Sequence, residues 1–189
     1  MPGWWMAWNL WLAVLPLGLA WGLFAIGRRP SPAWWAGVAA FIALLPNAPY
    51  VLTDVIHLLR AVRSSDDDLH TVLIAIPVWL LFFAIGFGAY VLAVARVERW
   101  LRWRGWSRPW LLGAELTLHA LCAVGVFLGR FFRLNSWDVL TRPDDVVGVV
   151  GIPEARSAAL VLVTFIAFVA GSVFVRYALG IRIRYAITQ

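Results

Sequence analysis

Long apolar runs separated by short charged connections dominate the chain. About five of these runs have roughly the 20 apolar residues that a helix needs to cross a bilayer. They lie at about residues 4–26, 33–59, 70–95, 111–129 and 158–177. A helix satisfies its backbone polar groups within one segment, as a lipid environment requires. The pattern therefore predicts an all-α fold, a polytopic transmembrane helix bundle, with residues 1–189 as a single integral membrane domain.

The second run is longer and more polar than the others. At 1.5 Å per residue it would extend roughly 40 Å, more than the roughly 30 Å of the hydrocarbon core. Pro46 and Pro49 lie within it, and proline lacks an N–H and disfavours helix in the residue before it. We therefore expect this span to be broken at Pro46/Pro49, with the positive end of a half-helix available to an anionic group. A plain proline kink is the alternative.

Polar side chains follow the two prolines at helical spacing. Tyr50, Asp54 and His57 stand at i, i+4 and i+7, which places them on one helix face. An Asp three residues before a His can orient the ring and raise its basicity. We predict His57 and Asp54 as catalytic residues and Asn47 and Tyr50 as substrate-binding residues. The alternative is a structural hydrogen-bond network at a helix end.

A second polar motif ends the fourth run. Arg130 and Arg133 stand three residues apart, so they share a helix face and can form a fork for a phosphate or carboxylate. The alternatives are arginines that extend to lipid headgroups or pair with Asp54 and Asp138. The residues predicted here to bind substrate are Arg130, Arg133, Asn135, Trp137 and Asp138, next to Ser136.

Ionisable residues also lie inside the fourth run. Glu115 and His119 stand at i and i+4, and Cys122 shares their face. A buried pair at membrane depth can relay protons or coordinate a metal. The alternative is a hydrogen bond between helices. Because Cys122 is the single cysteine, a disulfide framework is excluded.

Composition agrees with a membrane protein. Hydrophobic residues make up 62% of the chain, which argues against a soluble domain. The formal net charge of +6 could attract nucleic acid, but the arginines gather between the apolar runs, which argues against that partner. The basic, Trp-rich stretch 96–110 is predicted to be an interfacial loop that contacts anionic headgroups.

The distribution of arginine predicts an orientation. All 16 basic residues are arginine, and alternate connections divide them ten to six. The richer side is expected to be cytoplasmic. The N-terminus is then outside, the C-terminus is inside, and both polar motifs face outward. The richer side comprises Arg28, Arg29, Arg96, Arg99, Arg102, Arg104, Arg108, Arg176, Arg182 and Arg184.

Two motifs support a resemblance. Residues 47–58, NAPYVLTDVIHL, and 129–138, GRFFRLNSWD, resemble the hallmark motifs of a bacterial predicted membrane protein family, domain of unknown function 1361. Trp8-Asn9-Leu10 followed by Pro16 is similar to the family's opening pattern. The resemblance implies a multi-pass protein of the bacterial cytoplasmic (inner) membrane. It implies no activity.

These observations predict an outward-facing polar site that binds an anionic group. An enzyme acting on a lipid or lipid-linked phosphate at the outer leaflet is one hypothesis. A small transporter coupled through Glu115 and His119 is another, and a structural or accessory subunit is the third. Membrane lipids are the expected partners, and a homo-oligomer or a membrane partner stays open. No metal site is assigned, and the cofactor stays open; a metal variant would use Asp54, His57 and Asp138, with His70 as a further candidate.

Overall fold

The computed structural model describes residues 3–27, 29–63, 68–132, 144 and 155–181, and these contain no strand. Five helical stretches are long and apolar enough to cross a membrane, which confirms the predicted fold class. They are Trp4–Leu23, Pro32–Arg63, Thr71–Trp103, Arg108–Phe131 and Ala155–Ala178. The elements are α1 (Gly3–Leu23), α2 (Pro32–Leu44), α3 (Asn47–Tyr50), η1 (Val51–Asp54), α4 (Val55–Arg63), α5 (Asp68–His70), η2 (Thr71–Ala75), α6 (Ile76–Trp103), α7 (Arg108–Phe131) and α10 (Ala155–Ala178).

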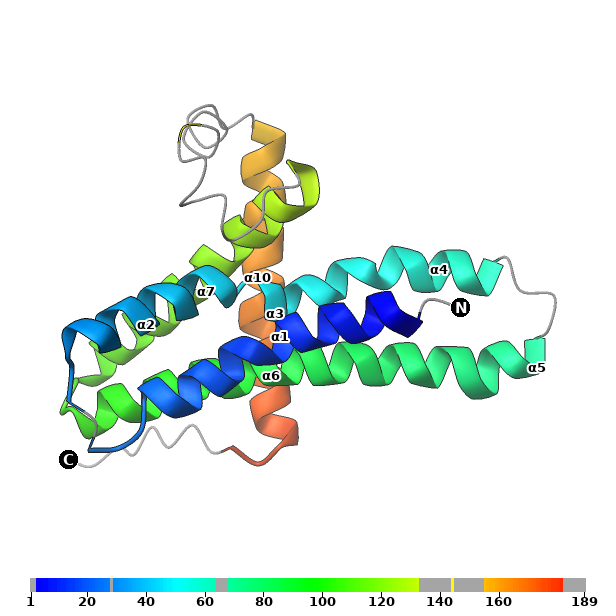
Figure 1. Cartoon of the computed structure of the whole chain (residues 1–189). Coiled ribbons are helices and arrows are strands. Elements are labelled where there is room, and N and C mark those ends of the chain that lie inside the picture. Colours follow the sequence, from blue (N-terminus) through cyan, green and yellow to red (C-terminus); the bar gives the residue numbers. More distant parts are fainter. Residues whose placement is uncertain (1–2, 28, 64–67, 133–143, 145–154, 182–189) are drawn as a thin grey trace.

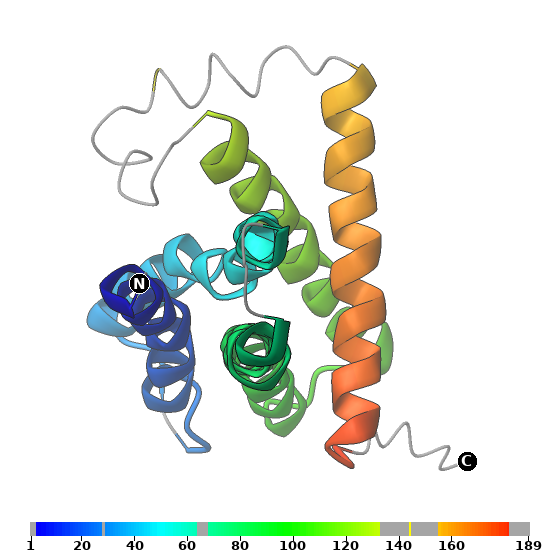
Figure 2. The same cartoon turned by 90° about the vertical axis from the view of Figure 1, so that its right-hand side faces the viewer.

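The helix α10 runs in a different direction from α1 and α6. The helix α1 lies along α6, while α10 packs mainly against α7 and crosses α6 steeply (Figures 1 and 2). The connections α1–α2 and α6–α7 lie at one end of the bundle, and α4 ends at the other (Figure 1). These are two of the connections that the charge count assigned to the arginine-rich side, and they lie together (Figure 1).

The second span is interrupted without being unwound. The helix α2 ends at Leu44, and a 3₁₀ turn, η1, separates α3 from α4. Pro46 keeps right-handed helical dihedrals, φ −60° and ψ −22°. The Ala48 N–H donates to the Leu45 carbonyl at 3.1 Å, an i to i+3 bond that tightens the turn where proline removes an N–H. The geometry is that of a proline kink, and no open half-helix end is formed.

The kinked segment is enclosed by α6 and α7 at close range. A Cβ atom on Gly86 of α6 would lie 2.3 Å from Val51 Cγ2, and one on Gly125 of α7 would lie 2.6 Å from Pro46 Cγ. Ala48 is 0% exposed. Small residues allow helices in membranes to approach closely and gain van der Waals contact. The kink is therefore held at the centre of the bundle.

The basic, Trp-rich stretch does not form the predicted loop. The helix α6 continues to Trp103, and the turn to α7 occupies only residues 104–107. Val97, Trp100 and Leu101 are buried at helical spacing, so the apolar stripe of α6 extends through this stretch. Packing of that stripe explains why the helix is longer than the apolar run. The third span is correspondingly longer than predicted.

Candidate functional site

The motif that follows the kink contains a buried carboxyl. Asp54 closes η1 and is 2% exposed. The charge of Arg130, in the last turn of α7, acts on this carboxyl. No direct ion pair joins the two side chains, and Asp54 Oδ2 is buried without a hydrogen-bond partner among the described residues. A buried acceptor within the electrostatic reach of Arg130 is therefore still unsatisfied among the described residues.

The other residues of this motif are half-buried around the kink. Asn47, Tyr50 and His57 each keep part of their surface accessible. The His57 ring meets Trp5 of α1 edge-on, with 5.2 Å between ring centroids. Asp54 and His57 make no hydrogen bond with each other in the part of the chain that is described. We call Asn47, Tyr50, Asp54, His57 and Arg130 the kink site.

The second half of the predicted site lies outside the described residues. This applies to Arg133, Asn135, Ser136, Trp137 and Asp138. Their predicted role in binding stays a prediction, as do the catalytic roles of His57 and Asp54. Within the described residues, no three His, Cys, Asp or Glu side chains form a group that could hold a metal ion.

A second polar cluster lies deeper in the bundle, around the pair predicted in the fourth span. His119 Nε2 lies 3.6 Å from Glu115 Oε1. On the opposite side of the imidazole, Nδ1 lies 2.5 Å from the hydroxyl of Tyr90 on α6. His119 and Tyr90 are both buried. The interhelical hydrogen bond expected as the alternative interpretation of this pair is therefore present.

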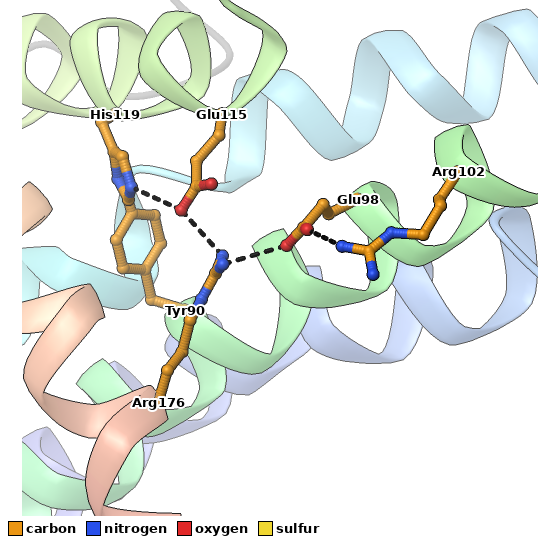
Figure 3. Close-up of polar contacts among 6 residues, drawn as sticks. All are labelled: Tyr90, Glu98, Arg102, Glu115, His119 and Arg176. Carbon is orange, nitrogen blue, oxygen red and sulfur yellow. Dashed lines mark hydrogen bonds and ion pairs between the residues drawn. The ribbon is translucent and has the colours of Figure 1, made fainter. Parts of the chain in front are cut away.

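The helix α10 supplies the cation of this cluster. Arg176 NH1 donates to Glu98 Oε2 at 2.9 Å, and NH2 lies 2.9 Å from Glu115 Oε1 (Figure 3). The second contact is an ion pair without hydrogen-bond alignment. Glu98 also binds Arg102 one turn further along α6. We call Tyr90, His119, Glu115, Arg176, Glu98 and Arg102 the polar chain; it joins α6, α7 and α10.

The positive and negative charges of the polar chain are equal in number. Two carboxylates, Glu98 and Glu115, face two guanidinium groups, Arg176 and Arg102. With neutral His119 the sum is zero. Arg176 is 1% exposed, and an uncompensated charge at that depth would be costly to desolvate. The ion pairs thus make the buried arginine tolerable and tie α10 to the other helices.

Part of this cluster was not predicted from the sequence. Arg176 was expected among the surface charges of the cytoplasmic side, and Glu98 in an interfacial loop. One signal was available: Arg176 lies within the last turn of the predicted apolar span 158–177, and an arginine inside a membrane span requires a partner. Tyr90 offered no signal, because a tyrosine in an apolar helix has many packing roles.

The comparisons with known proteins gave one match, to a protein family. A family model described as "Protein of unknown function (DUF1361)" matches residues 8–173. The chain belongs to this family. The match contains the whole kink site and every residue of the polar chain except Arg176, so this DUF1361 protein carries both groups largely within its family region. No curated protein and no solved structure matches the chain.

Proposed function

We propose that this multi-pass membrane protein binds, at the kink site, an anionic group that also carries a hydrogen-bond donor. The phosphate and hydroxyl groups of a lipid headgroup or lipid-linked substrate have this chemistry. One observation carries the proposal: buried Asp54 has an oxygen without a partner among the described residues, and the half-buried Arg130 acts electrostatically on the same carboxyl. The outward orientation rests on the distribution of arginine.

The two charges have complementary roles in this proposal. Guanidinium presents several N–H donors in a plane and suits phosphate or carboxylate oxygens. The carboxylate of Asp54 can only accept, so it requires a donor from the bound group. A headgroup with a phosphate and a neighbouring hydroxyl satisfies both at once. Asn47 and Tyr50 at the kink supply further polar contacts, and His57 is the residue for acid–base chemistry on a bound substrate.

Replacing Arg130 by Gln should remove most of the preference for anionic headgroups. A hydrogen bond to a charged group contributes about 1.5–3 kcal/mol, so we expect a loss of affinity on the order of tenfold or more. The measurement is native mass spectrometry of the full chain, released from nanodiscs of phosphatidylcholine with added phosphatidylglycerol. The number of retained phosphatidylglycerol molecules is compared between wild type and Arg130→Gln.

The matched control is Arg63→Gln, since Arg63 is exposed at the end of α4. Equal loss in both variants would show general attraction to anionic lipid and contradict the site. Competition by inorganic phosphate separates a phosphate site from one that requires the whole lipid. If Arg130→Gln instead unfolds the protein, the charge-conserving Arg130→Lys variant is compared with wild type. A folded Arg130→Lys with unchanged retention would contradict recognition by the guanidinium.

A further inference from the structure

The Tyr90 hydroxyl lies between two possible partners. It is 2.5 Å from His119 Nδ1, and the thiol of Cys122, one turn along α7, is within reach of the same hydroxyl. All three side chains are at most 1% exposed. A buried hydroxyl that can donate to either of two neighbours can change its donor direction without any movement of the backbone.

The direction of the hydrogen bond between Tyr90 and His119 decides which nitrogen of the neutral imidazole carries hydrogen. If Tyr90 donates to Nδ1, the ring hydrogen is on Nε2, which faces Glu115 Oε1 at 3.6 Å. The same oxygen lies 2.9 Å from Arg176 NH2 (Figure 3). One carboxylate oxygen is therefore shared between an imidazole from its own helix and the guanidinium of α10.

We propose that His119 is a proton-binding site and that its protonation weakens the attachment of α10. A proton added at Nδ1 turns this nitrogen into a donor. The Tyr90 oxygen then accepts, and its O–H turns to the Cys122 sulfur. The imidazolium pairs with Glu115 and competes there with Arg176.

The charges around His119 predict the direction in which pH changes the attachment of α10. Tyr90 faces the ring from α6, Glu115 and Cys122 lie on its own helix, and Arg176 reaches Glu115 from α10. Protonation raises the charge of the polar chain from zero to +1. Glu115 favours this state, whereas the neighbouring Arg176 opposes it. Falling pH should therefore loosen Arg176, which keeps its bond to Glu98.

The helix α10 packs against α7 and α6 but buries few side chains besides Arg176. Its other buried side chains are Phe168 and Ser172, and large apolar residues such as Val163 and Phe174 are exposed on it. Arg176 is its one buried charged contact with α6 and α7 among the described residues. A change at Glu115 is for this reason expected to reach the whole helix.

The experiment measures the protonation of His119 and the attachment of α10 separately, in the full chain in lipid nanodiscs. Imidazole ¹⁵N signals of labelled histidine report protonation, and the chain has only 3 histidines. The double variant His57→Gln/His70→Gln leaves His119 as the single signal. Hydrogen–deuterium exchange of α10 peptides is measured over the same pH series. The ratio to His119→Gln at each pH removes the intrinsic effect of pH on exchange.

We expect the His119 signal to convert from neutral to imidazolium as the pH falls, and the α10 exchange ratio to rise in parallel, on the order of tenfold. A His119 that stays neutral throughout the folded range would overturn the proposal. So would titration without a change in α10. If His119→Gln fails to fold, Tyr90→Phe serves as the reference. Because it removes the switching hydroxyl, its titration midpoint must differ from that of wild type, and an unchanged midpoint contradicts the proposal.

Discussion

Replacing Arg176 by Met should destabilise the protein by about 3–5 kcal/mol, the usual cost of removing one partner of a buried ion pair. Glu98 loses one of its two arginines, and Glu115 loses its only guanidinium partner among the described residues. Both carboxylates would keep a charge in a largely buried environment, since their side chains are only 12% and 13% exposed. Unfolding of the full chain by SDS titration, followed by the change in helix content, measures the loss of free energy of unfolding.

Arg156→Met is the matched control, because Arg156 stands on the same helix and is exposed. We expect it to change stability little. The triple variant Arg176→Met/Glu98→Gln/Glu115→Gln should recover much of the loss, since it leaves no uncompensated carboxylate. If Arg176→Met unfolds no more easily than Arg156→Met, the polar chain does not hold α10 in place. A triple variant as unstable as the single one would show that packing, and not charge, causes the loss.

Gly86→Ala should destabilise the bundle by about 1–3 kcal/mol through overpacking at the kink. The new Cβ atom would lie 2.3 Å from Val51 Cγ2 and 3.3 Å from the carbonyl oxygen of Ala48. One neighbour is a branched side chain fixed in the core, and the other is backbone, so neither can move freely. The same SDS titration measures the effect. Binding of phosphatidylglycerol should weaken as well, because η1 positions Asp54.

Gly88→Ala on the same helix provides the control, since a Cβ atom on Gly88 would meet nothing within 4 Å. It should be neutral or slightly stabilising. Val51→Ala removes the Cγ atoms that meet the new methyl group, so the double variant Gly86→Ala/Val51→Ala should be more stable than the sum of the single effects. Additive effects in this cycle would contradict the steric origin of the destabilisation.

The helices were predictable because membrane spans are encoded locally. About 20 apolar residues in a row leave no other stable structure in lipid, whatever the rest of the chain does. The position of the kink followed equally from Pro46 and Pro49, whose chemistry acts on their own turn. Its form did not follow, because the two prolines alone allow either an unwound break or a right-handed turn. In the structure the turn is right-handed and is enclosed by α6 at Gly86 and by α7 at Gly125.

The charge count shows where local reasoning fails. Arg176 was counted among ten arginines of the richer side, yet it is 1% exposed and bound to two carboxylates. Without it the division is nine (ten minus one) to six. The same direction of charge bias remains, so the predicted orientation stands as a prediction on the remaining arginines. A linear pattern does not distinguish an arginine at the end of a span from one inside a bundle.

The sequence by itself determined the membrane class, the number of long apolar helices, the position of the interruption at Pro46 and Pro49 and the spacing of Glu115 and His119, because each depends on residues within a few helical turns. Only the tertiary structure decided that Arg176 closes the polar chain, that Tyr90 binds His119, and that Asp54 is buried near Arg130. These contacts join helices that are far apart in the chain. In a membrane an unpaired buried charge is unfavourable, so each buried charged side chain requires a partner. Which partner it meets depends on how the helices pack.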